Sequence, residues 1–218
     1  MDTILTQFFS SPPIKKDEIL RYAGIKENIP DMDALVDECI LECENIFTYK
    51  VCYGIFPVSF DDGFVDLSFM KINSKALLEN LSGSKEAVVF AATTGLSLDR
   101  HISKYMRISP SKALMLQAIG TERIESLCDS FCEYIKCSYG FTTPRFSPGY
   151  GDFPIEFQKD IFRILSPETK IGLTLNHSML MSPSKSVTAV MGLTDKEETK
   201  KQNCSRCQKA DCLYRRKL

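Results

Sequence analysis

The order of strand-like and helical segments is the feature that most limits the fold of this chain. Strand patterns cover 49–60, 64–70 and 87–93, and two more cover 173–181 and 187–193, while helical patterns fill most of the interval between the two groups. Regular alternation of strand and helix, which builds a parallel doubly wound sheet, is missing. The sequence therefore predicts a single α+β domain with a mixed or antiparallel twisted sheet and flanking helices.

The segment after residue 48 has the composition of an antiparallel hairpin. Residues 49–60 are rich in aromatic and β-branched side chains, and the Asp-Asp-Gly sequence at 61–63 has the residue types of a tight turn. Val65, Leu67 and Phe69 then alternate with other residues, as in a strand with one buried face. We expect 49–60 and 64–70 to pair.

Two segments carry the strongest helical signals. Apolar residues recur at helical spacing over 33–47, and a Ser-Pro-Ser start at 109–111 opens a helix that runs to Lys136. Gly120 interrupts this long run, so the helix is expected to be continuous or split there. Shorter helices are expected over 17–23, 74–83, 98–106 and 155–165.

The chain changes character after Leu193, where the apolar content falls sharply. We therefore place a domain over 1–193 and a basic, Cys-rich tail over 194–218. The tail holds eight Lys or Arg against four Asp or Glu, a balance of +4, whereas the whole chain has a net charge of −1. A basic footprint over the whole chain is absent, which argues against nucleic acid as a partner.

The N-terminus and the cysteine content bear on location. The first residues lack a basic start before an apolar run, and no apolar stretch approaches the ~20 residues that span a membrane. Nine cysteines without an export signal favour a reducing, cytoplasmic setting, with free thiols or metal ligands in place of disulfides. A membrane partner is not expected.

Three of the cysteines lie close together in the tail, at Cys204, Cys207 and Cys212. Thiolates that share a metal would order a segment with no core of its own. Three ligands are one short of a structural zinc or iron–sulfur site, so another group would complete it. An iron–sulfur cluster suits a redox role better than zinc does. The alternative is a disordered basic tail with incidental thiols, and a nucleic-acid-binding zinc knuckle lacks its usual histidine.

The other cysteine pairs have a simpler interpretation. Cys39 and Cys43, and likewise Cys128 and Cys132, are four residues apart on the apolar faces of predicted helices. We expect buried free thiols at these positions.

The segment 145–154, RFSPGYGDFP, carries the strongest functional signal. Its glycines allow close backbone approach and its prolines stiffen it. Arg145 is a planar cation suited to a carboxylate or phosphate, and Tyr150 has a flat face and a hydroxyl. Such a loop can hold a ligand that is aromatic at one end and anionic at the other. The alternative is an ordered surface loop with a structural arginine. A dinucleotide fingerprint is rejected because Pro154 replaces its third glycine.

Further motifs follow this loop in order. The spaced sequence Arg145-x-x-x-Gly149-Tyr150-x-x-x-Pro154 leads into a predicted helix. The stretches IGLTL at 171–175, MSP at 181–183 and SV at 186–187 come next. This succession resembles the activation domain of vitamin B12-dependent methionine synthase. The resemblance is densest over 141–192 and extends more weakly upstream, through the TTG at 93–95 and the helix that contains Asp129.

The resemblance implies the fold of that domain and a binding site for S-adenosylmethionine on the Arg-x-x-x-Gly-Tyr loop. Arg145 would grip the methionine carboxylate, and the Gly149–Tyr150 segment, with Pro154 in the same motif, would approach the nucleoside. Asp129 matches an acidic family position and would contact polar groups of the ligand. Other acids share its helix, so the alternative is a solvated acidic face: Glu122, Glu125 and Glu133.

The resemblance also implies a role in repairing a corrinoid enzyme. Cobalamin oxidised to its inactive two-valent state would be restored by an electron from a flavodoxin or ferredoxin-type donor and a methyl group from S-adenosylmethionine. The chain looks like a stand-alone form, with the Cys-rich tail in place of the family's usual C-terminal segment. Cobalamin would then be held by a partner, a separately encoded methionine synthase or a related corrinoid protein.

No catalytic side chain is expected, because the cobalt is the nucleophile and the sulfonium already has a good leaving group. His177 stands where the family commonly has an acid, so its role stays open. Two other functions are kept as alternatives. One is an iron–sulfur redox accessory protein for a corrinoid methyltransferase, and the other is a non-enzymatic docking factor.

Overall fold

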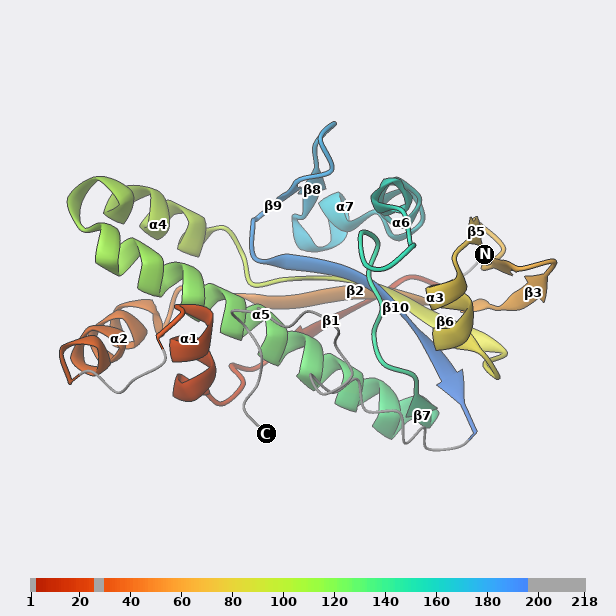
Figure 1. The fold of residues 1–218 in the computed structure, drawn as a ribbon, viewed down its shortest axis with the longest axis horizontal. Coiled ribbons are helices and arrows are strands. Elements are labelled where there is room, and N and C mark those ends of the chain that lie inside the picture. Colours follow the sequence, from red (N-terminus) through yellow and green to blue (C-terminus); the bar gives the residue numbers. More distant parts are fainter. Residues whose placement is uncertain (1–2, 26–29, 196–218) are drawn as a thin grey trace.

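The computed structural model describes residues 3–25 and 30–195. Their main sheet has five strands in the order β1 (Leu5–Phe9), β2 (Tyr49–Pro57), β6 (Glu86–Thr93), β10 (Ser186–Thr194) and β7 (Phe141–Thr142). Every neighbouring pair is antiparallel, and helices cover both faces of the sheet (Figure 1). The predicted α+β class is confirmed, and of the two predicted sheet types the antiparallel one is correct.

One long helix, α5 (Pro110–Tyr139), covers one face of the sheet. Pro110 occupies its first turn, where a missing N–H costs nothing, and Gly140 follows its end at φ 100°. Gly120 does not split the helix. A Cβ on Gly120 would lie 2.2 Å from Cδ2 of Leu98, which belongs to α4 (Ser97–Ile108). The glycine therefore allows two helices to approach closely.

The remaining helices form two groups. Two of them pack with α4 around the N-terminal half of α5 and enclose a core of their own: α1 (Lys16–Tyr22) and α2 (Pro30–Cys43). The others lie on the opposite face of the sheet from α5: α3 (Lys75–Leu81), the short 3-10 helix η1 (Ile155–Phe157), α6 (Gln158–Leu165) and α7 (Pro167–Ile171). No helix in the described residues is long and apolar enough to cross a membrane.

The predicted hairpin between 49–60 and 64–70 is wrong in its pairing. β2 is buried along most of its length and lies between β1 and β6 in the main sheet. The Asp-Asp-Gly turn instead joins β3 (Ser59–Asp61) to β4 (Phe64–Asp66), which with β5 (Lys71–Asn73) forms a separate small sheet. Side chains of β2 are buried in the hydrophobic clusters on both faces of the main sheet, and its two hydrogen-bonding edges pair with β1 and β6.

Two further strand assignments differ from the sequence prediction. The edge strand β1 was not expected. Residues 173–181 do not form one strand, because β8 (Thr174–Leu175) and β9 (Met181–Ser182) pair across a turn. The Asn176 carboxamide oxygen accepts the N–H groups of Ser178 and Leu180 and so stabilises that turn, which leaves His177 exposed.

The predicted buried thiols are confirmed at Cys39, Cys43 and Cys128, while Cys132 is half-buried; Cys52 is buried as well. Burial raises the pKa of the Cys39 thiol to about 11 and that of Cys43 to about 12. These thiols are therefore neutral at physiological pH and serve as apolar packing groups.

Candidate functional site

The RFSPGYGDFP loop begins as a backbone extension of the main sheet. Phe146 and Val190 exchange two backbone hydrogen bonds of 2.8 and 2.9 Å, and the Thr143 N–H donates to the Gly192 carbonyl at 2.9 Å. The Gly192 N–H in turn donates to Oγ1 of Thr143 at 2.8 Å. Residues 143–146 are thereby held beside β10, which fixes where the rest of the loop starts.

The tip of the loop is a compact turn built on glycine. Gly149 and Gly151 have φ angles of 91° and 56°, which residues that carry a side chain rarely adopt. The Gly149 N–H donates to the Phe153 carbonyl at 2.7 Å. The Phe153 ring is fully buried and stacks on Phe146 with ring centroids 6.2 Å apart. Tyr150, by contrast, is 68% exposed, so the turn presents its ring outward.

A carboxylate ties the loop to the start of α3. Asp152 accepts hydrogen bonds from Oγ of Ser74 at 2.5 Å and from the N–H groups of Lys75 at 2.8 Å and Ala76 at 3.2 Å. The Ser74 hydroxyl, followed by these backbone donors, lowers the pKa of Asp152 below its ordinary value. Ser74 also caps α3 by accepting the Leu77 N–H at 3.0 Å.

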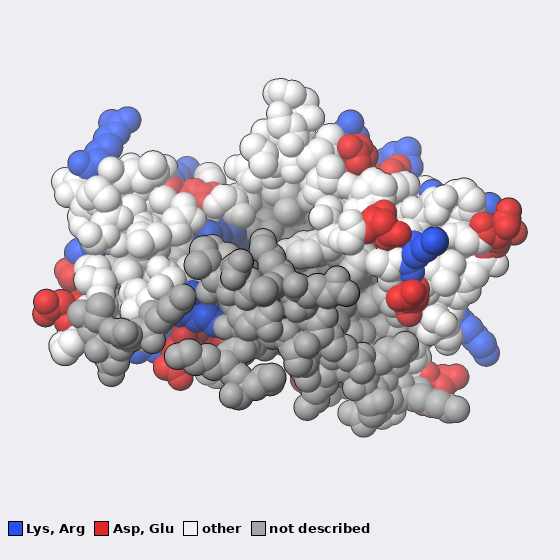
Figure 2. All heavy atoms as spheres, viewed as in Figure 1, with Lys and Arg blue, Asp and Glu red and all other residues white. Residues whose placement is uncertain are grey.

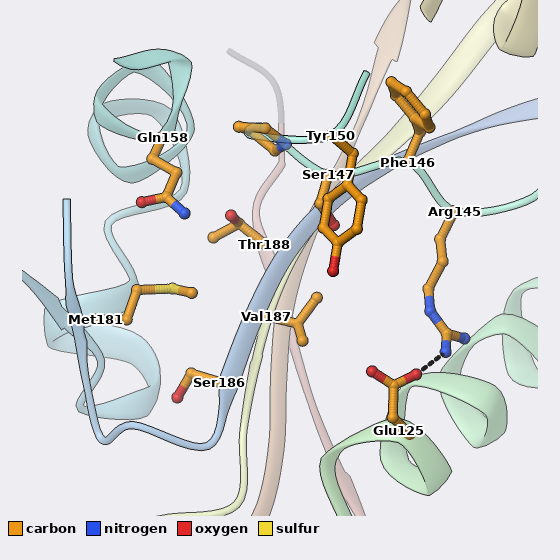
Figure 3. A pocket seen from close by; sticks show the side chains of 11 residues that line it. Glu125, Arg145, Phe146, Ser147, Tyr150, Gln158, Met181, Ser186, Val187 and Thr188 are labelled. Carbon is orange, nitrogen blue, oxygen red and sulfur yellow. Dashed lines mark hydrogen bonds and ion pairs between the residues drawn. The ribbon is translucent and has the colours of Figure 1, made fainter. Parts of the chain in front are cut away.

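A cavity of about 330 Å³ lies between this loop, β10, α5 and α6. In Figure 3, Arg145 and Glu125 stand at one end, and Gln158 and Met181 stand at the other. Tyr150 projects between the two ends. The remaining lining residues are Phe146, Ser147, Pro148, Ser186, Val187 and Thr188. The volume lies within the usual range of small-molecule sites.

At the first end, Arg145 is paired with two acids from α5. Its Nη2 donates to Oε2 of Glu125 at 2.5 Å, and its Nη1 donates to Oδ1 of Asp129 at 2.8 Å. Burial disfavours the guanidinium charge, but the surrounding groups outweigh burial and raise the pKa of Arg145. Both acids are half-exposed, whereas the arginine side chain is 25% exposed. One cation and two carboxylates are therefore gathered at a single point.

A smaller cavity of about 240 Å³ adjoins this cluster. It is also lined by Arg145, Glu125 and Asp129, together with Lys15 and Glu122 among others. Lys15 Nζ lies 3.4 Å from Oδ2 of Asp129. The side chain of Arg145 thus stands between two hollows, with acids from α5 facing both.

The far end of the larger cavity holds buried polar groups without partners. Oε1 of Gln158 and Oγ1 of Thr188 receive no hydrogen bond from any described residue, although their residues are 6% and 1% exposed. An unpaired buried polar group costs about 1–3 kcal/mol. Both oxygens are themselves buried, so a ligand in the cavity reaches them only if a side chain moves.

The predicted site residues are distributed as follows. Arg145 and Tyr150 line the larger cavity, and Asp129 reaches it only through Arg145. Gly149 and Pro154 are not in the wall of either cavity: Gly149 shapes the turn, and Pro154 precedes η1.

Sequence reasoning left Glu125 as one acid among several and missed Gln158 and Thr188. A signal for Gln158 exists, since it shares a helical face with the buried Ile161 and Leu165. A polar residue on an apolar stripe marks either a satisfied core group or a site.

The cysteines predicted as metal ligands, Cys204, Cys207 and Cys212, lie outside the described residues. Within residues 3–25 and 30–195, no three His, Cys, Asp or Glu side chains are placed to hold a metal ion. The described residues on the face in Figure 2 carry acidic and basic side chains in scattered, mixed groups.

Comparisons with known proteins agree with this fold. The family described as vitamin B12 dependent methionine synthase, activation domain, matches residues 77–217. A solved structure, the MetH reactivation domain bound to AdoHcy, is similar with a TM-score of 0.65 and 15% sequence identity, over 90% of this chain and 80% of that one. A comparison with curated proteins found no match. Because the family match spans more than half of the residues, the chain belongs to the family of vitamin B12-dependent methionine synthase activation domains.

Proposed function

We propose that this chain binds S-adenosylmethionine in the cavity beside Arg145 and supports reactivation of cobalamin held by a separate methionine synthase or related corrinoid protein. Membership of the activation-domain family supports the proposal. The observation that carries it is the pairing of Arg145 with Glu125 at one end of a ligand-sized cavity, where the same guanidinium also pairs with Asp129.

The charges of this cluster suit the amino-acid head of S-adenosylmethionine. Its carboxylate would pair with the fork of Arg145, and its ammonium group would pair with Glu125 and Asp129. The two acids now satisfy the guanidinium, so an incoming zwitterion exchanges ion pairs and leaves no buried charge unpaired. Asp129 then acts on the polar head, as the family resemblance implies.

The rest of the cavity suits a nucleoside. The exposed ring of Tyr150 offers a stacking surface, and Met181 and Val187 add apolar contacts. The turn built on Gly149 and anchored through Asp152 holds the Tyr150 segment in place before ligand arrives. Preorganisation of this kind lowers the entropic cost of binding.

When bound, S-adenosylmethionine would supply a methyl group to the partner's cobalamin and leave as S-adenosylhomocysteine, once a flavodoxin or ferredoxin-type donor had supplied one electron. The residues of this chain bind and orient the methyl donor, and none is required as acid, base or nucleophile.

The tail completes the proposal. The proposed division is a folded domain over 1–193, whose last strand β10 runs one residue further, and a Cys-rich tail over 194–218. The tail would bind an iron–sulfur cluster or zinc through Cys204, Cys207 and Cys212. The spacing of the three cysteines supports this assignment.

Calorimetry with S-adenosylmethionine, followed by a reactivation assay, tests the function. Mixing the full chain with an oxidised corrinoid methionine synthase, S-adenosylmethionine and a low-potential donor should regenerate methylcobalamin. Failure to bind S-adenosylmethionine would favour the iron–sulfur accessory function if iron is present, and the docking function if it is not. Methylation of free cobalamin as fast as the protein-bound form would contradict the need for a partner.

A further inference from the structure

The side chain of Lys185 lies across α5 next to the larger cavity. Its stem passes over Gly120, because a Cβ built on that glycine would lie 2.9 Å from Cγ and 3.0 Å from Cε of the lysine. Its Nζ donates to Oγ1 of Thr121 at 3.0 Å, and the Thr121 hydroxyl donates in turn to the Gln117 carbonyl at 2.9 Å. The ammonium is therefore hydrogen-bonded to a neutral group, which leaves its charge without a counter-charge.

Carboxylates neutralise several other lysines of the described chain, namely Lys15, Lys16, Lys71, Lys112 and Lys136. Lys185 is half-buried and forms no ion pair with any residue of 3–25 and 30–195. Both carboxylate oxygens of the neighbouring Asp99 accept from Ser184, one from the N–H and one from Oγ. Burial lowers the pKa of Lys185, and the charge of Asp99 only partly opposes this effect. A cation in this state is stabilised by an anion that arrives from outside.

The backbone that carries Lys185 is held from two sides. Thr94, just after β6, donates its N–H at 3.1 Å and its Oγ1 at 3.3 Å to the Lys185 carbonyl. Ser184 is bound to Asp99 in the first turn of α4. The ammonium is therefore presented from a fixed position, so little conformational entropy is lost when an anion pairs with it.

The place of Lys185 in the fold puts this charge beside the candidate site. The next two residues of the chain, Ser186 and Val187, line the larger cavity. Thr121 precedes Glu125 on α5 by about one helical turn, roughly 5–6 Å along the axis. Figure 3 shows Ser186, Val187 and Glu125 in the lower half of the view of the cavity. A protein that brings its cobalamin to this cavity therefore approaches Lys185 as well.

We propose that Lys185 pairs with a carboxylate, the side chain of an Asp or Glu, on the corrinoid protein that docks over the cavity. The inference rests on the proposed function, which supplies that partner. One ammonium with a neutral hydroxyl beside it lacks a single negative charge, and a carboxylate supplies it. Charge pairs across an interface speed association and discriminate against wrong partners. Lys185 would thus select the partner, whereas Arg145 binds S-adenosylmethionine.

Reactivation kinetics of the full chain with an oxidised corrinoid methionine synthase, S-adenosylmethionine and a low-potential donor test the contact. Lys185→Met keeps a stem over Gly120 and removes the charge, so the KM for the corrinoid protein should rise roughly tenfold. Lys185→Glu places like charges together and should raise that KM roughly a hundredfold. Both variants should bind S-adenosylmethionine in calorimetry as the wild type does. Added salt should raise the KM of the wild type toward that of Lys185→Met.

Lys85→Met is the matched control, because it removes the same charge far from the site. Lys85 is exposed and precedes Glu86, the first residue of β6, whereas Thr94 and Lys185 meet beyond the other end of that strand. Eight strand residues separate the two lysines by roughly 25 Å. Lys85→Met should keep the KM of the wild type.

The outcomes distinguish the two proposals. If the wild type does not bind S-adenosylmethionine, the proposed function is wrong and the Lys185 contact is wrong with it. If the wild type is active and Lys185→Met keeps its KM for the corrinoid protein, the contact alone is overturned. An equal rise in KM for Lys85→Met would trace the effect to net charge, and a large fall in the melting temperature of Lys185→Met would trace it to folding. Equal slowing with free cobalamin would place the anion on the cofactor, and each of these three results also overturns the contact.

Discussion

At the scale of a single residue, Arg145 has two possible sets of partners: a ligand carboxylate and two acids of this chain. Its guanidinium is suited to a ligand carboxylate, and in the structure it is already engaged by Glu125 and Asp129. Ion pairs between partly exposed groups contribute only about 0.2–1 kcal/mol each, so these acids hold the fork in place without binding it tightly. A substitution here therefore affects ligand affinity more than stability.

We predict that Arg145→Ala binds S-adenosylmethionine roughly tenfold to a hundredfold more weakly, because a hydrogen bond to a charged group contributes about 1.5–3 kcal/mol. Arg145→Lys keeps the charge, loses the planar fork and should also bind more weakly. Calorimetry and the ligand-free melting temperature of both variants test this. An unchanged dissociation constant for Arg145→Ala, with a large loss of stability, would assign Arg145 a structural role.

A second prediction concerns Asp152, whose pKa is lowered by its hydrogen bonds at the start of α3. Its folded pKa lies below the ordinary value of 3.8, so its contribution to stability is complete above that value and is lost as pH falls through the folded pKa. Asp152→Asn should therefore be less stable than the wild type at pH 6, and the gap should narrow near pH 2–3. Denaturant unfolding at both pH values measures the gap, and a constant gap would contradict the assignment.

At the scale of elements, the packing of α4 on α5 depends on Gly120. An added Cβ would meet Leu98 at 2.2 Å and Lys185 Cγ at 2.9 Å, and Leu98 is fully buried. We expect Gly120→Ala to destabilise the protein by about 1–3 kcal/mol despite the better helix propensity of alanine. Equilibrium unfolding measures this loss.

The Leu98→Ala background supplies the control for Gly120→Ala. Truncating Leu98 removes the nearest atom, so the cost of Gly120→Ala should be smaller there, which a double-mutant cycle detects. An equal cost in both backgrounds would show that the Leu98 contact is not the reason for glycine at this position.

At the scale of the whole molecule, the strand β10 sets where the domain can be cut. It continues to Thr194, and its last residues pair with Thr142 and Phe141. A chain that ends after Asp195 should keep a single cooperative melting transition and lose any bound iron or zinc, whereas a cut before Leu193 would remove part of the sheet. Metal analysis after anaerobic purification and calorimetric melting test the two parts. A full-length chain without metal contradicts the first, and a truncated chain that does not fold contradicts the second.

The sequence by itself determined the local features whose cause lies within a few residues. Apolar periodicity located α2, the Ser-Pro-Ser start located the beginning of α5, and the Asp-Asp-Gly turn closed a hairpin. The ordered motifs of the loop and the strands after it indicated the family, which the match over 77–217 shows. These features need no knowledge of distant contacts.

Only the tertiary structure decided which distant groups meet. The pairing of β2 with β1 and β6, and the use of Gly120 for helix packing, depend on residues far apart in the chain. Glu125 is a partner of Arg145 because α5 passes beside the RFSPGYGDFP loop in the folded chain. Gln158 and Thr188 line one cavity because α6 and β10 contribute to the same hydrophobic core, through Ile161 and Leu165 on the helix and Val190 on the strand. Burial and hydrogen-bond satisfaction act through space, so they select these contacts only once the chain has folded.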